Sequence, residues 1–289
     1  MRSGVVGLLP SDPPSITTAD ARRALELGFT GTSVQLGQPD TYALDEFRRV
    51  GDLLNAEGLT VAQANGQYPS LISLDPAVRQ AGIDGMRRHM QAAHALRAET
   101  LYIRPGGLNP VGPWYPHPDH HQDAAFERAV ESISLIAEAA EAAEAEGITL
   151  TVEGHVLSVL DRPERIAELF RRIPTRALGF NLDPVNFIGS IWDAWNPDPV
   201  YERLLEAAHG RIPAAHWKDY TLEDRLVLHI EEVPLGQGVV DHAAWLTALD
   251  EVAPRAWVLI EHLPPELIPA AKRVLDAAMA EAGLNWDPA

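Results

Sequence analysis

The chain lacks cysteine altogether, and it also lacks a long apolar run and an excess of basic residues. Without cysteine, disulfide bonds and thiolate chemistry are excluded, which suits a reducing compartment. The apolar piece at the amino end breaks at Pro10 and is too short for a secretory signal peptide. No apolar run approaches the length of a membrane-spanning helix. We therefore expect a cytoplasmic protein with no membrane partner.

The charge balance limits the kind of binding partner, and the length of the chain limits the fold. The chain has 23 basic and 41 acidic residues, a formal net charge of −18. A nucleic-acid binder needs a basic surface to displace counterions from phosphates, so this balance argues against a nucleic-acid partner. With 289 residues, 46% of them hydrophobic, the chain can bury a large core in two ordinary domains or in one α/β barrel.

Short apolar segments alternate with helical patterns along the whole chain. The expected strands are residues 4–9, 32–36, 59–64, 100–104, 148–155, 177–182, 212–216 and 256–260. Capping signals and periodicity predict helices between them, such as residues 44–57 before Gly58 and a helix from Asp123 to just before Gly147. Asp161 and Glu164 have the spacing of a helix N-cap and its third-residue acid.

Eight strand–helix pairs without a change in composition predict one α/β domain over residues 1–289, a (β/α)₈ TIM barrel. A doubly wound open sheet is the competing topology. It would carry a glycine-rich phosphate turn after the first strand, and GVVGLLP at residues 4–10 does not supply one. Extended loops are expected at residues 105–122 and 217–240. The first is rich in proline, glycine and aromatic residues, which is typical of a functional loop.

Polar side chains end four consecutive apolar strands, the fifth to the eighth. They are Glu153, Asp183, His216 and Glu261. Singly, each acid can be the cap of the next helix and the histidine can belong to the core. In a barrel, however, the carboxyl ends of the strands share one mouth, so these side chains are expected to converge on one metal ion. Three carboxylates and one imidazole suit Mn²⁺, and Mg²⁺ or Co²⁺ next, better than structural Zn²⁺, which is not excluded.

Several motifs resemble one family over essentially the whole chain. They are TVEGH (residues 151–155), NLDPVN (181–186), HWKD (216–219), PLGQGVVD (234–241) and LIEH (259–262). The chain resembles the xylose isomerase-like barrels, in particular the sugar phosphate isomerase/epimerase group that includes ketose 3-epimerases, inosose dehydratases and endonuclease IV. The resemblance implies that Glu153, Asp183, His216 and Glu261 bind one divalent metal ion.

The chain departs from parts of this family. Three-metal sites like that of endonuclease IV carry a histidine where this chain has Asn186, and further histidines where it has Ala64, Asn65 and Arg104. With the acidic charge, these differences argue against DNA repair. Several ketose 3-epimerases also have a histidine at the position of Asn186, so their substrate geometry does not transfer directly.

The resemblance implies a metal-dependent isomerase or epimerase that acts on a keto-sugar or related polyol through an enediolate. Glu153 and Glu261 are the expected acid/base pair. The same apparatus supports a lyase or dehydratase that eliminates from an oxidised cyclitol or a 3-oxo-glycoside, including deglycosidation of C-glycosides. A non-catalytic barrel subunit is the third possibility, but it would be expected to have lost a ligand.

Further residues are expected to contact a small carbohydrate substrate. They are His155, Arg104, Asn186, Lys218, Trp114, His117 and Gln35. Lys218 can polarise a substrate oxygen or pair with Asp219, and Arg104 can bind a carboxylate, a phosphate or a hydroxyl group, or pair with an acid. No phosphate cradle is evident, which favours an unphosphorylated substrate. Whether the protein is a homo-oligomer or has a partner subunit is left open.

Overall fold

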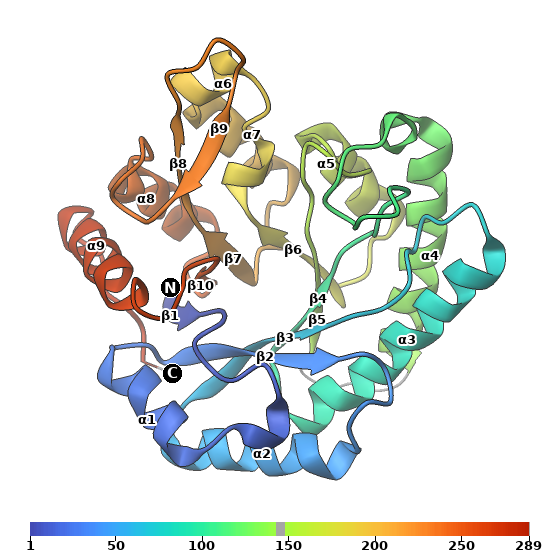
Figure 1. Cartoon of the computed structure of the whole chain (residues 1–289), viewed down its shortest axis with the longest axis horizontal. Coiled ribbons are helices and arrows are strands. Elements are labelled where there is room, and N and C mark those ends of the chain that lie inside the picture. The colour runs from blue at the N-terminus through green and yellow to red at the C-terminus, as the bar shows by residue number, and fades with distance from the viewer. Residues whose placement is uncertain (143–147, 289) are drawn as a thin grey trace.

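A computed structural model describes residues 1–142 and 148–288 (Figure 1). Eight parallel strands close into a barrel in the order β1-β10-β7-β6-β5-β4-β3-β2, which confirms the predicted (β/α)₈ fold. The barrel strands are β1 (Arg2–Val5), β2 (Gly31–Gly37), β3 (Thr60–Gly66), β4 (Thr100–Ile103), β5 (Thr149–Val152), β6 (Leu178–Leu182), β7 (Ala214–Trp217) and β10 (Trp257–Ile260).

Helices form a ring around these strands (Figure 1). They are α1 (Thr18–Glu26), α2 (Leu44–Glu57), α3 (Pro76–Ala95), α4 (Asp123–Ala142), α5 (Pro163–Arg172), α6 (Ile191–Trp195), α7 (Asp198–Ala207), α8 (His242–Val252) and α9 (Ile268–Glu281). Single turns of 3₁₀ helix lie at Pro13–Ser15, Pro118–His121 and Pro184–Phe187. The predicted continuation of α4 toward Gly147 lies outside the described residues.

Local sequence explains where the helices begin and end. Gly58 ends α2 with φ at +84°, a left-handed conformation that glycine adopts without strain. Asp75 begins α3 by accepting a hydrogen bond from the backbone N–H of Ala77 at 2.8 Å. The bounds of α2, Leu44–Glu57, are those that the sequence predicts.

The predicted cap of α5 is wrong. Arg162, not Asp161, occupies the N-cap position of that helix. The Asp161 carboxylate instead lies 2.7 Å from His121 Nδ1 and 2.7 Å from Arg162 Nη1. The carboxylate therefore ties the loop before α4 to the loop before α5 rather than capping the helix.

The first strand ends earlier than the sequence predicts. Residues 4–9 were expected to be extended, but β1 pairs with β10 only from Arg2 to Val5. Gly7, with φ at +79°, then turns the chain away from the barrel. The apolar residues Leu8 and Leu9 are buried in the core from a loop, which is why their hydrophobicity resembled that of a strand.

The region predicted as a second extended loop, residues 217–240, contains an antiparallel hairpin of β8 (Asp219–Leu222) and β9 (Ile230–Val233). The Asp219 carboxylate holds its base, because it accepts hydrogen bonds from the backbone N–H groups of Gly236 at 3.0 Å and Gly238 at 2.9 Å. It also accepts one from the backbone N–H of Val240 at 3.2 Å. A Cβ atom on Gly238 would lie 2.1 Å from Asp219 Oδ1, so only glycine fits there.

The other loop, residues 105–122, is fixed to the barrel by a buried histidine. His120 Nε2 accepts a hydrogen bond from the backbone N–H of Leu108 at 2.7 Å, and its Nδ1 lies 2.7 Å from the carbonyl oxygen of Leu157. None of the helices in the described residues combines the length and the apolar character that crossing a bilayer requires.

Candidate metal and substrate site

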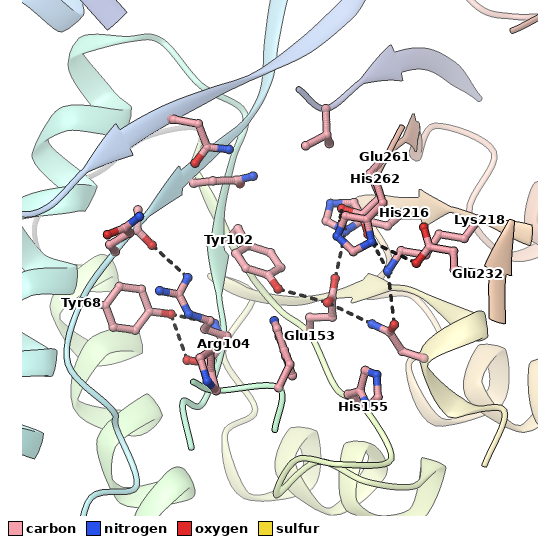
Figure 2. Close-up of a pocket in the computed structure, with 18 of the residues that line it drawn as sticks. Tyr68, Tyr102, Arg104, Glu153, His155, His216, Lys218, Glu232, Glu261 and His262 are labelled. Atoms are coloured by element: carbon pink, nitrogen blue, oxygen red, sulfur yellow. Dashed lines mark hydrogen bonds and ion pairs between the residues drawn. The ribbon is translucent and has the colours of Figure 1, made fainter. Parts of the chain in front are cut away.

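A cavity of about 640 Å³ opens at the carboxyl ends of the barrel strands. Figure 2 shows the polar side chains that converge in it. Its lining residues include Gln35, Gln38, Asn65, Gln67, Tyr68, Tyr102, Arg104, Trp114, Glu153, His155, Asn186, His216, Lys218, Glu232, Glu261 and His262. In this fold the carboxyl ends of the strands are where active sites form, so the cavity is the candidate functional site.

The residues predicted as metal ligands come from neighbouring strands. Glu153 and Asp183 directly follow β5 and β6, His216 lies within β7, and Glu261 follows β10. All are buried. The barrel places β5, β6, β7 and β10 side by side, which explains why side chains far apart in the sequence meet.

His216 lies at the centre of this group. Its Nδ1 atom is 3.0 Å from Oε2 of Glu153 and 3.0 Å from Oε2 of Glu261. Lys218 contacts two of the predicted ligands. Its Nζ lies 2.6 Å from Oδ2 of Asp183 and 2.8 Å from Oε1 of Glu261. Each buried carboxylate therefore has a positively charged or polar neighbour within 3.0 Å.

The arrangement fits a metal ion. Ligand atoms of Glu153, Asp183 and His216 all lie within 4.8 Å of one another. Within the described part of the chain, His216 Nδ1 and both carboxylate oxygens of Asp183 are buried without a partner of hydrogen-bonding geometry. The same atoms lie close to charged groups, with Lys218 Nζ near Asp183 and the Glu153 and Glu261 carboxylates near His216 Nδ1. The indication of a cation site is therefore the convergence of buried carboxylate and imidazole ligand atoms. Glu261 contacts this group through His216 and Lys218.

Burial and the neighbouring charges shift the pKa values of these groups. Burial raises the pKa of Asp183 to about 7, although Lys218 opposes the shift. Burial also acts to raise the pKa of Glu261, but His216 and Lys218 outweigh it and hold that pKa well below its usual range. Burial lowers the pKa of His216, yet Glu261 and Glu153 more than compensate and raise it to about 10. A divalent ion at this site would favour the deprotonated form of each ligand.

Sequence reasoning missed a chain of buried amides beneath the site. Gln63 Oε1 lies 2.9 Å from His216 Nε2, and Gln63 Nε2 donates to Asn181 Oδ1 at 2.9 Å. Asn181 Nδ2 in turn donates to Oε2 of Glu153 at 2.5 Å. Because Gln63 Oε1 can only accept, Nε2 of His216 carries a proton, and Nδ1 is the nitrogen that would lose its proton to bind an ion. The signal in the sequence was that Gln63 and Asn181 are polar residues within apolar strands, since polar residues are seldom fully buried without a role.

Gln63→Leu is expected to weaken Mn²⁺ binding about 10- to 100-fold, because it removes the acceptor that fixes the His216 ring. Isothermal titration calorimetry measures the affinity, and ¹⁵N NMR of the imidazole reports the tautomer. Gln80→Leu, on an exposed face of α3, is the matched control. If Gln63→Leu binds Mn²⁺ as the wild type does, Gln63 has no part in presenting Nδ1.

Tyr102 is a second residue that the sequence did not single out. Its hydroxyl donates to Oε1 of Glu153 at 3.1 Å, and its ring stacks on His216 with the ring centroids 5.8 Å apart. Burial, with Glu153 nearby, raises the pKa of Tyr102 well above its ordinary value. The phenol therefore stays protonated and acts as a fixed donor to Glu153.

Most of the residues predicted to contact substrate line the cavity: Gln35, Arg104, Trp114, His155, Asn186 and Lys218. His117 is not among the lining residues. Its Nδ1 accepts a hydrogen bond from the backbone N–H of Asp119 at 3.2 Å, which begins the 3₁₀ turn there. The contact predicted for His117 therefore gains no support from its position.

The partners of these lining residues clarify their roles. Lys218 does not pair with Asp219, which holds the hairpin; it contacts Asp183 and Glu261, and Asn186 Oδ1 at 3.2 Å. Asn186 Nδ2 also donates to Oε1 of Glu153 at 3.1 Å, so Asn186 links Lys218 to the predicted ligands.

His155 lies beside Trp114 on the cavity wall, with the ring centroids 5.7 Å apart. Its Nδ1 accepts a hydrogen bond from the backbone N–H of Leu157 at 3.0 Å. Burial, and then Lys218, lower its pKa to about 4. At neutral pH His155 is therefore an uncharged side chain whose Nε2 carries the proton.

The hairpin contributes to the cavity from outside the barrel. Glu232 of β9 lines the cavity, and its Oε2 lies 3.1 Å from Nδ1 of His262. His262 follows the predicted ligand Glu261 and has a left-handed φ of +56°. The residues predicted as an open loop thus form part of the wall of the site.

The model of the xylose isomerase-like TIM barrel family matches residues 21–279. The chain belongs to that family. A comparison with curated protein sequences finds no match.

Solved structures with the same fold include a D-tagatose 3-epimerase-like protein, with a TM-score of 0.74 and 18% identity over 98% of each chain. The apo form of the 3-keto-D-glucoside 4-epimerase from E. coli has a TM-score of 0.71 and 14% identity, over 97% of this chain and 99% of that chain. The IolI protein with a bound zinc atom has a TM-score of 0.70 and 17% identity over 98% of each chain. At these identities the likeness establishes the fold.

Proposed function

We propose that the protein is a divalent-metal-dependent isomerase or epimerase that acts on a keto-sugar or related polyol through an enediolate. The observation that carries the proposal is the convergence of buried ligand atoms of Glu153, Asp183 and His216 within 4.8 Å of one another, with Glu261 Oε2 3.0 Å from His216 Nδ1. The fold neighbours support it, because a 3-epimerase-like protein and a 4-epimerase of sugars are among them.

Glu153, Asp183, His216 and Glu261 would hold the ion, with Mn²⁺ as our first choice and Mg²⁺ or Co²⁺ next. The bound zinc atom in the IolI structure keeps Zn²⁺ among the candidates. A divalent ion there would supply positive charge that stabilises the oxyanion developing on the substrate.

Glu153 and Glu261 are the proposed acid/base pair. They follow β5 and β10, which β6 and β7 separate in the barrel, and the Oε2 atom of each lies 3.0 Å from His216 Nδ1. One carboxylate can therefore take a proton from the substrate carbon and the other can return it. Return to the opposite face of the same carbon gives epimerisation, and return to the neighbouring carbon gives isomerisation.

Tyr102, Asn181 and Asn186 fix the orientation of Glu153, because each donates a hydrogen bond to its carboxylate. A carboxylate held by three donors keeps its position when a substrate enters. His155, Gln35 and Trp114 are proposed to contact the sugar from the cavity walls. A cytoplasmic location completes the proposal; it is consistent with a chain that has no cysteine.

Elimination from an oxidised glycoside is the second candidate. The cavity of about 640 Å³ extends from the ligand group to Trp114 and Arg104, which leaves room for a substituent beyond one sugar ring. A fold neighbour acts on a 3-keto-glucoside, a substrate of this class. The same two carboxylates would then remove a proton and protonate the leaving group.

A Mn²⁺-supplemented screen of keto-sugars and 3-oxo-glycosides, read by chromatography and mass spectrometry, tests the proposal. The expected product has the mass of the substrate and a different retention time. Loss of water or of the aglycone would establish elimination instead. If the protein binds Mn²⁺ but converts no compound of either class, the proposed reaction is wrong.

A further inference from the structure

We propose that Arg104 binds a carboxylate on the substrate, so that the substrate is an acidic sugar rather than a neutral one. The inference rests on the proposed function and narrows its substrate class. Arg104 directly follows β4 and lines the cavity, and Tyr68 packs against it in the same wall. In Figure 2 Arg104 and Tyr68 lie across the cavity from Lys218 and Glu232.

The guanidinium of Arg104 is held in a fixed orientation. Its Nη1 donates to the carbonyl oxygen of Gly66 at 3.0 Å, and its Cζ lies 4.9 Å from the ring centroid of Tyr68. The Tyr68 hydroxyl accepts a hydrogen bond from the backbone N–H of Arg104 at 2.7 Å and lies 2.9 Å from its carbonyl oxygen. One tyrosine therefore supports both the backbone and the charged head of this residue. A planar cation positioned in this way loses little rotational freedom when it binds an anion.

Arg104 has no acidic partner among the residues that the structure describes, although many arginines of this acidic chain have one. The acids that line the cavity, Glu153, Glu232 and Glu261, contact His216, His262 and Lys218. Lys218 is thus already paired with carboxylates, whereas the charge of Arg104 is available to a ligand.

The chemistry of the wall favours a carboxylate over a phosphate. Guanidinium N–H groups lie in a plane and match the two oxygens of a carboxylate. Phosphate sites usually add a backbone N–H cradle at a helix end or a second cation. Gln38 and Gln67, which line the same cavity, are neutral amides, and Gln38 Nε2 donates to Gln67 Oε1 at 3.0 Å. Amides suit the hydroxyl groups of a sugar.

The overall charge makes a local cation necessary. With a formal net charge of −18, the protein as a whole does not attract an anionic ligand. A carboxylate can be recognised only where a positive group faces the cavity, and Arg104 provides that group at a distance from the predicted metal ligands. The substrate would then be oriented with its acidic end at β4 and its carbonyl end at the ligand group.

The binding test uses the Mn²⁺-supplemented protein and the matched pair D-glucuronate and D-glucose, titrated by calorimetry or ligand-observed NMR. We expect the wild type to bind the acid about 10- to 100-fold more tightly, as one charge-assisted pair allows. Arg104→Gln is expected to bring the ratio close to one. Arg104→Lys keeps the charge but loses the planar pair of N–H donors, so it is expected to give an intermediate ratio. Arg79→Gln is the matched control, because Arg79 donates to the carbonyl oxygen of Ser73 and is not among the residues that line the cavity.

Circular dichroism and Mn²⁺ affinity check that the variants fold. Equal binding of acid and neutral sugar by the wild type, or an unchanged ratio in Arg104→Gln, would overturn the proposal. A preference for D-glucose 6-phosphate over D-glucuronate that depends on Arg104 would overturn the assignment to a carboxylate. The binding test needs no turnover, so it decides whether Arg104 binds a carboxylate even if the proposed reaction is wrong. In a kinetic arm, equal kcat/KM for D-fructuronate and D-fructose would reject the acidic substrate while leaving the isomerase proposal in place.

Discussion

Replacing Glu153 or Glu261 with glutamine is expected to lower kcat by about 10²- to 10⁴-fold, the range typical of a lost general acid or base. Glutamine keeps the size of the side chain but cannot take up a proton at neutral pH. In Glu153→Gln the new NH₂ group is a donor, and it replaces an oxygen of a carboxylate that accepts hydrogen bonds from Tyr102, Asn181 and Asn186. Steady-state kinetics on the substrate found in the screen measure the loss, and elemental analysis measures the retained Mn²⁺.

Metal content separates a catalytic role from a purely ligating one. We expect each variant to retain Mn²⁺ at least in part, since the other predicted ligands remain. Glu232→Gln is the matched control, because Glu232 lines the same cavity but pairs with His262 at its rim. It should lose less than about ten-fold, as exposed pairs contribute little. Near-normal turnover in Glu153→Gln or Glu261→Gln would show that the residue is not part of the acid/base pair.

Removing the metal is expected to abolish turnover, and adding Mn²⁺ back is expected to restore it. Binding should also stabilise the fold, by about 2.7 kcal/mol when free Mn²⁺ is 100 times the Kd. Differential scanning fluorimetry with and without chelator measures this as a rise in Tm. Asp183→Ala should eliminate both effects, because Asp183 supplies one of the three buried groups whose ligand atoms lie within 4.8 Å of one another.

Asp161→Ala is the matched control for Asp183→Ala. Asp161 is also a strongly engaged carboxylate, but it pairs with His121 and Arg162 away from the cavity. It should lower the Tm in the presence and absence of Mn²⁺ by the same amount. If wild-type turnover survives chelation and Mn²⁺ leaves the Tm unchanged, the metal hypothesis fails, whatever the variants do.

The barrel was predictable because its strands are apolar segments that repeat at regular intervals with helices between them. The convergence of the strand-end residues followed from topology alone, since the carboxyl ends of parallel barrel strands share one rim. The family match confirms the fold and the family. The roles of Glu153, Asp183, His216 and Glu261 as ligands remain predictions, now supported by their contacts.

What escaped prediction depends on distances across the barrel. Gln63 and Asn181 are 118 positions apart, and only the closed sheet brings their amides within 2.9 Å. The sequence could not identify the partners of Lys218 for the same reason. Asp219 is its neighbour in the sequence, whereas Asp183 and Glu261 are its neighbours in space. The hairpin β8–β9 was mistaken for a loop because its strands are short and largely polar, and Asp219 stabilises it through backbone N–H groups that no side-chain pattern reveals.

The position of Asp219 has a consequence for protein engineering. Asp219 fastens the hairpin at its base, whereas the tip is solvent-exposed, with Leu226 and Val227 outside the core. Insertions at an exposed tip leave the contacts at the base intact. The tip at residues 224–228 is therefore the place to add an affinity tag, a fluorophore or a second module without displacing the predicted metal ligands, and residues 234–240 are the place to avoid.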